Sequence, residues 1–198
     1  MNEIVFKLLL LGDSTVGKTS LMIRFCDNFY EENKVSNIGT IFKSKEIEIN
    51  NQKIELNIYD TSGQERYRSL AKNYLRNANG IIFVFDLTND NTFENITNWL
   101  NNCNDVINNY QKILVGNKLD LEDKQIDERR VEKFCSENNM KYFEASAKNG
   151  KNVEIIFKEI ALLILDDKQK KEKENEMAEQ NNNIKIQTHK SKKGKKRC

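Results

Sequence analysis

The fold of this 198-residue chain is decided by the stretch Gly12-Asp13-Ser14-Thr15-Val16-Gly17-Lys18-Thr19, which fits the pattern G-x-x-x-x-G-K-[ST] and follows the apolar run Ile4–Leu11. Glycines let backbone N–H groups wrap phosphate groups, and the helix that the pattern opens adds a favourable dipole. Lys18 reaches the outer phosphates, and Thr19 offers a hydroxyl to a magnesium ion. A chance match has an expectation of about 0.003 for this composition. We therefore predict a phosphate-binding loop between a strand and a helix.

Outward from this loop, short apolar runs alternate with amphipathic stretches, which is typical of a mostly parallel sheet with helices on both faces. The predicted strands are Ile4–Leu11, Lys53–Asp60, Gly80–Asp86, Lys112–Gly116 and Lys141–Ala145, and the predicted helices follow Gly17, Thr92, Asp127 and Gly150. The segment Lys43–Asn50 alternates and leads into Asn50-Asn51, which favours an antiparallel edge strand joined by a tight turn. The sequence thus predicts an α/β fold: a mostly parallel six-stranded sheet, with one antiparallel edge strand and about five helices.

The composition changes near Leu165, and this divides the chain into residues 1–165 and 166–198. The second segment has no aromatic residue, and its eleven basic and six acidic residues give a net charge of +5. The first segment has 21 basic and 24 acidic residues, a net −3, so the overall +2 conceals two unlike parts. Because the second segment has little to bury, we expect it to be disordered. The balanced total does not indicate a nucleic-acid-binding protein.

The remaining composition excludes several classes of protein. The four cysteines show no C-x-x-C spacing, so neither a zinc site nor a disulfide framework is expected. No apolar run approaches the roughly 20 residues that span a bilayer. The chain has no proline and 28 asparagines, so a short asparagine motif is weak evidence by itself.

Three further motifs follow predicted strands. Asp60 opens Asp60-Thr61-Ser62-Gly63-Gln64-Glu65, and an aspartate at a strand's carboxyl end faces the ligand crevice of a parallel sheet, where it can hold magnesium through water. Asn117-Lys118-Leu119-Asp120 has a chance expectation of about 0.2. Its place at a strand end gives it meaning, because an aspartate that accepts two hydrogen bonds from guanine discriminates against adenine. Ser146-Ala147-Lys148 offers a backbone N–H to the guanine oxygen.

Taken together and in this order, these motifs resemble those of the small GTPases of the Ras superfamily, over roughly residues 4 to 165. The Rab family is the most similar branch, on the evidence of Asn37-Ile38-Gly39-Thr40-Ile41-Phe42 and of the runs LNIYDTSGQERYRSL, NYLRNANGIIFVFDLTN and ILVGNKLD. The resemblance implies the P-loop GTPase fold, binding of GTP and GDP with Mg²⁺, and hydrolysis of GTP by in-line attack of water.

The resemblance also implies roles for single residues. Gln64 orients the attacking water, the Gly63 N–H senses the γ-phosphate, and Lys18 contacts the outer phosphates. Thr19 binds magnesium directly and Asp60 binds it through water. The residues expected around the nucleotide are Gly12, Asp13, Ser14, Thr15, Val16, Gly17, Lys18, Thr19, Ser20, Tyr30, Asn37, Asp60, Gly63, Asn117, Lys118, Asp120, Ser146, Ala147 and Lys148. No arginine is evident for the reaction in the chain itself, so slow intrinsic turnover and an arginine supplied by a partner are expected.

Some positions depart from the family pattern. Asn37 stands where the family has a magnesium-binding threonine, and its amide oxygen is a weaker candidate ligand. We expect GTP binding with a less firmly closed loop in the active state. Thr15 stands where glycine is common, and Ser62 where alanine is usual. The aromatic residues Phe42, Tyr59 and Tyr74 match the family's effector-binding patch.

The last residues of the sequence predict attachment to a membrane surface. Residues 190–198 hold five lysines and one arginine, without an acidic residue, and end in Cys198. One lipid chain holds a membrane only marginally, and adjacent positive charge supplies the second signal. We therefore expect prenylation of Cys198 and a place on the cytoplasmic face of an intracellular membrane or the plasma membrane, cycling with the cytosol. The implied partners are an exchange factor (GEF), a GTPase-activating protein (GAP), a GDP-dissociation inhibitor, the prenylation machinery and effectors. A monomer is expected.

Other functions remain open at this stage. The chain fits a Rab-like switch in vesicle trafficking, a switch-impaired Rab-like binding module, or a signalling Ras-like GTPase. An ATP-using P-loop enzyme is disfavoured by the motif at residues 117–120.

Overall fold

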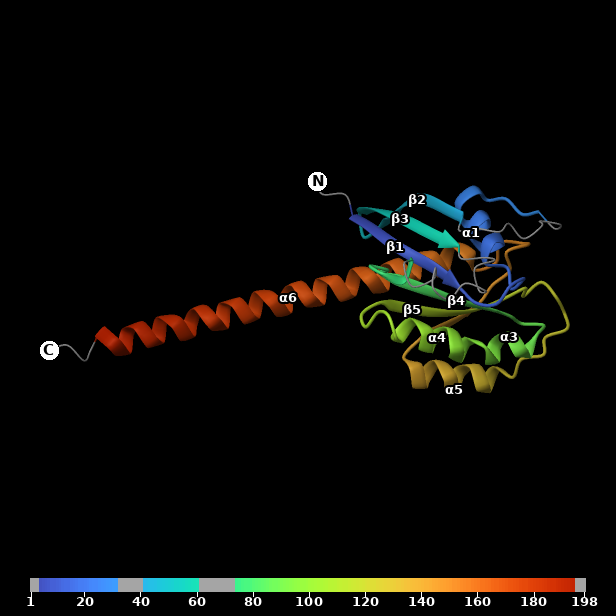
Figure 1. Ribbon diagram of the computed structural model, residues 1–198. Coiled ribbons are helices and arrows are strands. Elements are labelled where there is room, and N and C mark those ends of the chain that lie inside the picture. Colours follow the sequence, from blue (N-terminus) through green and yellow to red (C-terminus); the bar gives the residue numbers. More distant parts are fainter. Residues whose placement is uncertain (1–3, 32–40, 61–73, 195–198) are drawn as a thin grey trace. The chain divides into compact units, whose positions relative to one another are not determined.

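A computed structural model describes residues 4–31, 41–60 and 74–194, with side chains placed as far as Met177. It contains a six-stranded sheet in the order β2-β3-β1-β4-β5-β6 (Figure 1). The strands are β1 (Ile4–Leu11), β2 (Ile41–Ile49), β3 (Gln52–Asp60), β4 (Gly80–Asp86), β5 (Gln111–Asn117) and β6 (Lys141–Glu144). All pairs are parallel except β2 with β3. The predicted fold class is therefore confirmed.

The antiparallel edge forms where the alternating segment was expected. Asn50 and Asn51 have φ of +51° and +60° and connect Ile49 to Gln52, which are paired across the turn. Two successive positive φ angles match the right-handed twist of paired strands, and asparagine adopts them more readily than most residues. The tight turn is thus encoded locally by the two asparagines.

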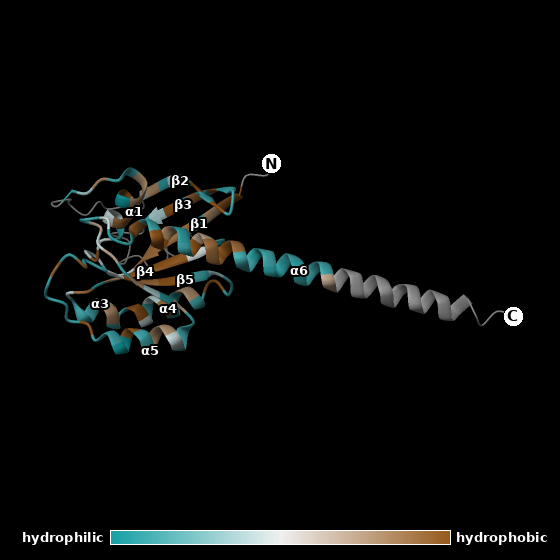
Figure 2. Ribbon diagram, turned by 180° about the vertical axis from the view of Figure 1, so that it is seen from behind, coloured by the Kyte–Doolittle hydropathy of each residue, from teal (hydrophilic) through white to brown (hydrophobic). Residues whose placement is uncertain are grey.

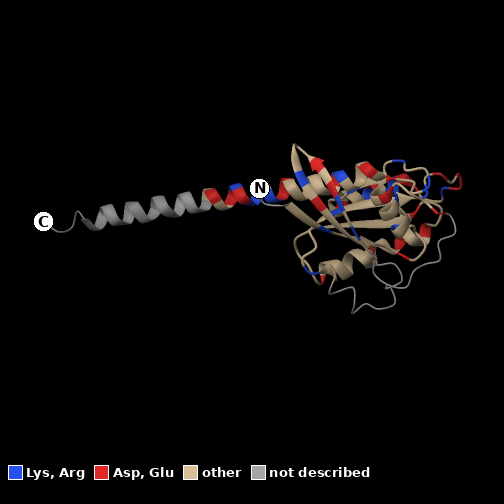
Figure 3. Ribbon diagram, turned by 90° about the horizontal axis from the view of Figure 1, so that it is seen from above, with Lys and Arg blue, Asp and Glu red and all other residues tan. Residues whose placement is uncertain are grey.

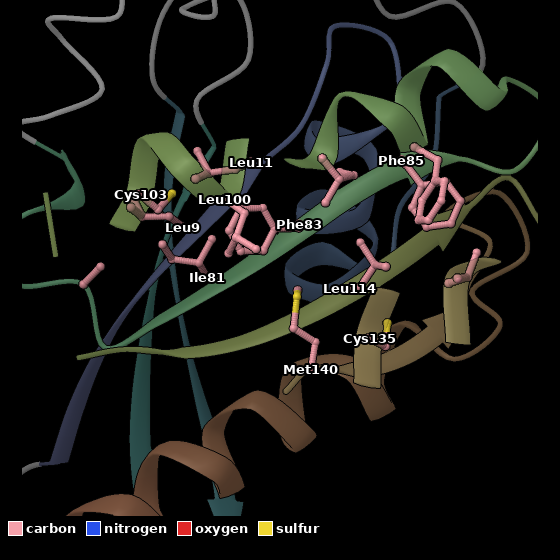
Figure 4. Packing of buried hydrophobic residues seen from close by; sticks show 14 of the residues in the cluster. Leu9, Leu11, Ile81, Phe83, Phe85, Leu100, Cys103, Leu114, Cys135 and Met140 are labelled. Carbon is pink, nitrogen blue, oxygen red and sulfur yellow. The ribbon is translucent and has the colours of Figure 1, made fainter. Parts of the chain in front are cut away.

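Helices cover both faces of the sheet. The described helices are α1 (Lys18–Asp27), α3 (Asp90–Glu94), α4 (Ile96–Asn104), α5 (Glu128–Asn138) and α6 (Val153–Gly194). One core cluster joins β1, β4 and β5 to α4 and α5 (Figure 4). On the other face, Phe25 of α1 stacks on Phe157 of α6, with 4.1 Å between ring centroids. β4 is buried along its whole length, as expected for a central parallel strand.

Local signals set the helix ends. Asp127 caps α5, because its side chain accepts a hydrogen bond from the Arg129 N–H at 3.0 Å. Asn28 and Asn139 follow α1 and α5 in the left-handed conformation, and each donates its backbone N–H to a carbonyl of the last turn. Asparagine therefore ends both helices in the way that glycine often does.

The chain divides into two compact units, Met1–Ile164 and Leu165–Cys198. The structure continues α6 to Gly194, across the boundary expected near residue 165, and the expected disorder of the second segment stays a prediction. Residues 166–193 contain neither proline nor glycine and are rich in lysine, glutamate and glutamine, which favour helix without burial. Figure 2 shows the described part of α6 turning from apolar to polar, and Figure 3 shows residues of both charge signs along it. Lys171 pairs with Asp167 one turn earlier.

Among the described residues, no helix is both long and apolar enough to span a membrane.

Candidate functional site

The loops that hold most of the predicted site residues described by the structure lie at one edge of the sheet. Because β1, β3, β5 and β6 run parallel, the loops that follow them leave from the same edge. Residues 12–17 connect β1 to α1, Asp60 ends β3, and Asn117 ends β5. Residues 146–148 follow β6. Four segments that are far apart in the sequence thus meet at the ligand-binding edge of an open α/β sheet.

The two glycines of the loop at residues 12–19 are required by the backbone. Gly12 has φ of +144°, and a Cβ there would lie 2.0 Å from the Val84 carbonyl oxygen. Gly17 has φ of +96°, and a Cβ there would lie 2.2 Å from Nδ2 of Asn117. Real side chains do not tolerate such approaches, so the loop packs against β4 and β5 only with glycine at both ends. Thr15 has φ of +65°, which explains why glycine is common there in the family.

Lys18 lies under this loop and is buried. Its ammonium group donates hydrogen bonds to the carbonyl oxygens of Gly12, at 2.7 Å, and Asp13, at 2.6 Å. The loop is therefore wrapped around a positive charge, at the N-terminus of α1, whose dipole adds to it. Both features favour an anion such as phosphate. Ser20 continues the first turn of α1 and is half-buried.

Thr19 and Asp60 bring two oxygen donors together. The Thr19 hydroxyl donates a hydrogen bond to the carboxylate of Asp60, which is fully buried at the end of β3. A hydroxyl and a carboxylate are ligands that magnesium prefers. No group of three His, Cys, Asp or Glu side chains suited to a metal occurs in the described part of the chain. The arrangement suits an ion completed by phosphate and water.

Asn117 connects the two ends of the site. It is buried, its Nδ2 donates to the Val16 carbonyl oxygen at 2.8 Å, and its Oδ1 accepts from the Ala147 N–H at 3.2 Å. One side chain therefore ties the loop after β1 to the loop after β6. An amide suits this position because it offers a donor and an acceptor at once.

Lys118 and Asp120 are each held by a partner from another segment. Lys118 has φ of +68°, and its ammonium lies 2.6 Å from the carboxylate of Asp86, at the end of β4. Asp120 accepts a hydrogen bond from the hydroxyl of Ser146, which is fully buried. The backbone adds support, since the Leu119 N–H donates to the Ala145 carbonyl oxygen at 2.9 Å. The two motifs predicted to bind a base thus form one cross-linked unit.

Arg24, which the sequence analysis did not single out, reaches this unit from α1. Its Nε donates to the Ala147 carbonyl oxygen at 2.8 Å, and its Nη2 donates to that of Lys148 at 2.6 Å. Its guanidinium carbon lies 6.0 Å from the centroid of the Tyr30 ring. Tyr30, predicted to pack on a base, is thereby linked to residues 147–148. No motif signals Arg24, because it lies within an ordinary amphipathic helix.

Asp13 has two partners that the sequence analysis also missed. Its carboxylate accepts a hydrogen bond from Nδ2 of Asn95 at 2.7 Å and another from the Trp99 indole N–H at 2.9 Å. These contacts fasten the loop to α4 and to the residue that precedes it. Asparagine is so frequent in this chain that Asn95 carried no signal of its own.

Several predicted residues lie outside the described residues: Asn37, Gly63, Gln64 and Cys198. Of the predicted aromatic patch, Phe42 is half exposed, its ring centroid lies 5.0 Å from that of Tyr59, and the Tyr59 and Tyr74 centroids are 6.1 Å apart. The three rings form one cluster.

The described cysteines are poor nucleophiles. Burial raises the pKa of the thiols of Cys26 and Cys135 to about 11 and that of Cys103 to about 12. The thiolate is the reactive form, so these groups are almost wholly protonated near neutral pH. They are free thiols, as the lack of a disulfide pattern predicts.

Comparison with known proteins places the chain among small GTPases. A model described as the Ras family matches residues 7–166. The chain is 39% identical over 193 residues to Ras-related protein Rab-8B of Homo sapiens, covering 96% of this chain and 93% of that protein. It is 40% identical over 198 residues to Ras-related protein Rab-10 of Diplobatis ommata, with 99% and 96% covered. It is 44% identical over 167 residues to Ras-related protein Rab-1 of Theileria parva, with 83% and 76% covered.

Proposed function

This chain belongs to the Ras family, as a Rab-like small GTPase that binds guanine nucleotides, hydrolyses GTP to GDP and acts in vesicle trafficking, and we propose that the loops at the carboxyl edge of its sheet carry out the reaction. One observation carries the proposal. Buried Lys18 lies under the first loop, and buried Asn117 joins that loop to the base-binding unit. A positive phosphate end and a polar base end are thus held at a fixed separation, as a nucleotide requires.

At the phosphate end, residues 12–19 receive the phosphates through backbone N–H groups and Lys18. Mg²⁺ would be held by the Thr19 hydroxyl directly and by Asp60 through water, and their hydrogen bond supports this assignment, because it brings both oxygens to one point. When bound, the ion neutralises charge on the phosphate oxygens. The Lys18 ammonium adds a second positive charge on the same side.

At the base end, Asp120 accepts two hydrogen bonds from the guanine N1–H and 2-amino groups, and the backbone of residues 147–148 donates to the guanine oxygen, since the Ser146 N–H already donates to the Lys151 carbonyl oxygen. Ser146 supports this role, since its hydroxyl holds one carboxylate oxygen of Asp120. Asn117, Lys118 and Tyr30 complete the pocket. Adenine presents an acceptor where guanine presents N1–H, so it is rejected.

Hydrolysis is an in-line attack of water on the γ-phosphorus of GTP, for which Gln64 orients the water and the Gly63 N–H contacts the γ-phosphate. Catalysis then consists mostly of positioning and charge neutralisation. We expect slow turnover by the chain alone and acceleration by a GAP that supplies an arginine. Fast single-turnover hydrolysis without any partner contradicts this part of the proposal.

Asn37 weakens the active state, because its amide oxygen lies one bond further from the backbone than the family's threonine hydroxyl and reaches the ion in a different geometry. Replacing Asn37→Thr should tighten the GTP-dependent binding of effectors to a surface that includes the cluster of Phe42, Tyr59 and Tyr74. Binding of GTP-loaded and GDP-loaded protein to a captured effector measures this. An unchanged ratio counts against a role for Asn37 in the switch.

Cys198 is the proposed site of prenylation, by the prenylation machinery, and the adjacent basic residues supply the second membrane signal. The raised thiol pKa values of Cys26, Cys103 and Cys135 support this choice, because they disfavour those groups as nucleophiles. The chain then cycles as a monomer between the cytosol and a cytoplasmic membrane face, with a GEF and a GDP-dissociation inhibitor as partners. Intact mass of protein from native membranes, before and after Cys198→Ser, tests the modification.

Nucleotide identity tests the central proposal. Denaturing the purified protein should release guanine nucleotide in close to equal molar amount, and added GTP should be converted to GDP and phosphate only with magnesium present. Release of adenine nucleotide overturns the assigned base pocket. Turnover that persists in excess chelator overturns the assignment of Thr19 and Asp60 to the ion.

A further inference from the structure

Arg24 makes several contacts that no part of the proposed reaction uses. Besides its bonds to the carbonyl oxygens of Ala147 and Lys148, its Nη1 donates to the carbonyl oxygen of Asn28 at 3.1 Å. The Tyr30 ring lies beside its guanidinium group. A planar guanidinium fork that contacts three carbonyl groups and a ring fixes their relative positions more firmly than a single contact does.

We propose that Arg24 is a positioning residue of the guanine pocket: it sets the direction of the backbone N–H groups that recognise the guanine carbonyl oxygen, and it holds Tyr30 against the base. This inference rests on the proposed function. It assigns to α1 a second task, because the helix begins at Lys18 under the proposed phosphate site and reaches the base loop at Arg24, about 1.7 turns later.

Peptide geometry supplies the reason. In a planar trans peptide, the C=O and the following N–H point in opposite directions. Arg24 holds the Ala147 carbonyl group, so the Lys148 N–H of the same peptide unit points away from α1. The bond to the Lys148 carbonyl oxygen acts on the next peptide unit, whose Asn149 N–H donates to the Ser146 hydroxyl oxygen at 3.2 Å. The guanidinium group therefore sets the direction of the Lys148 N–H without touching the base.

The surroundings of the loop leave this task to Arg24. The Ser146 side chain is engaged with Asp120, and Asn117 holds the Ala147 N–H from the side of β5. Both contacts act on groups that precede the Ala147 carbonyl. Arg24 donates to the carbonyl groups of Ala147 and Lys148 themselves. Its loss therefore removes a restraint on the peptide unit between Ala147 and Lys148, while Asp120 keeps its place.

Because Arg24 acts on the backbone donors and not on Asp120, its replacement should change recognition of the guanine oxygen alone. A merely structural role would change the binding of all nucleotides equally. Arg24→Gln removes the fork and the charge, and Arg24→Lys keeps the charge and loses the fork. Arg129→Gln is the matched control, since Arg129 is an exposed arginine on α5. Dissociation constants are measured on the full chain with magnesium for GDP, 6-thio-GDP and IDP. Replacing oxygen by sulfur in 6-thio-GDP weakens only the acceptor at position 6, whereas IDP lacks only the 2-amino group.

We expect Arg24→Gln to weaken GDP binding by about tenfold, the size of one or two lost hydrogen bonds. The preference for GDP over 6-thio-GDP should fall toward unity, and the preference for GDP over IDP should stay as in the unsubstituted protein. Arg24→Lys should resemble Arg24→Gln, because an ammonium group cannot contact two carbonyl groups in the same geometry. Arg129→Gln should change none of these quantities.

An equal loss of affinity for all three diphosphates, or an unchanged preference over 6-thio-GDP, overturns the inference. If Arg24→Gln fails to fold, Arg24→Lys decides by the same criteria. The unsubstituted protein separates this failure from failure of the proposed pocket. If it does not discriminate GDP from IDP or 6-thio-GDP, the pocket itself is wrong. If it does, and the Arg24 variants discriminate equally well, only the role of Arg24 is wrong.

Discussion

The phosphate-binding loop at residues 12–19 and the base-binding unit at residues 117–120 and 146–148 are held in place by different means. The first depends on its own backbone: glycines at both ends and Lys18, which bonds to the carbonyl oxygens of the same loop. The second depends on side chains from elsewhere, among them Arg24 of α1 and Asp86 of β4. A self-contained loop binds any phosphate chain. A unit assembled from several elements can be shaped to one base.

The largest expected effect comes from removing the positive charge of the first region. Lys18→Ala should weaken GDP binding by at least about a hundredfold, because it deletes a buried ammonium group that we propose contacts the phosphates. It should weaken IDP binding by the same factor, since the phosphate end does not recognise the base. Equilibrium titration with both nucleotides measures this, with Lys133→Ala on the exposed face of α5 as control. If Lys18→Ala weakens the binding of GDP and IDP by different factors, the phosphate-binding and base-binding regions do not act separately.

The second region should show the opposite behaviour. Asp120→Asn replaces one acceptor by an N–H₂ donor that faces the guanine 2-amino group, so GDP binding should weaken about tenfold to a hundredfold. Xanthosine diphosphate carries an oxygen in place of the 2-amino group. It should bind the Asp120→Asn variant more tightly than it binds the unsubstituted protein. The asparagine oxygen can still accept from Ser146, so the local fold should persist. Competition between the two diphosphates measures the change, and a variant that still prefers GDP contradicts the role of Asp120.

Asn117 joins the two regions, so its loss should affect both. Asn117→Ala removes the hydrogen bonds to Val16 and from Ala147 and leaves a buried carbonyl oxygen unpaired. The expected cost is about 1–3 kcal/mol in the free energy of unfolding, together with weaker binding of every nucleotide. Chemical denaturation and GDP titration measure the two effects. Asn138→Ala is a suitable control, because Asn138 also donates to a carbonyl oxygen, that of Phe134, but within α5. A normal stability with lost binding contradicts the bridging role.

The same division decides what the sequence could predict. The loop at residues 12–19 was predicted in full, because its pattern, its glycines and the flanking strand and helix are contiguous. The strand-end positions of Asp60 and Asn117 followed from the apolar runs before them. The partners Arg24, Asp86 and Trp99 were not predicted, because each meets the site only through the fold, at separations of 123, 32 and 86 residues from Ala147, Lys118 and Asp13. A helix as long as α6 was not predicted, because residues 166–193 have little to bury and favour helix through local propensity alone.

The smallest expected effect concerns a departure within the self-contained loop. Thr15 has φ of +65°, which a β-branched residue adopts at a cost of about 1 kcal/mol. Thr15→Gly should recover part of this strain and raise the unfolding temperature by about 2–4 °C, measured at a fixed saturating concentration of GDP.

Ser14→Gly is the matched control, since Ser14 is also exposed and has no positive φ. There, glycine only adds entropy to the unfolded chain and should lower the unfolding temperature. The GDP dissociation constant is measured beside each melt, because tighter binding alone also raises the unfolding temperature. If both substitutions change the unfolding temperature equally, Thr15 is not strained. The rigidity of the loop then comes from its contacts with β4 and β5.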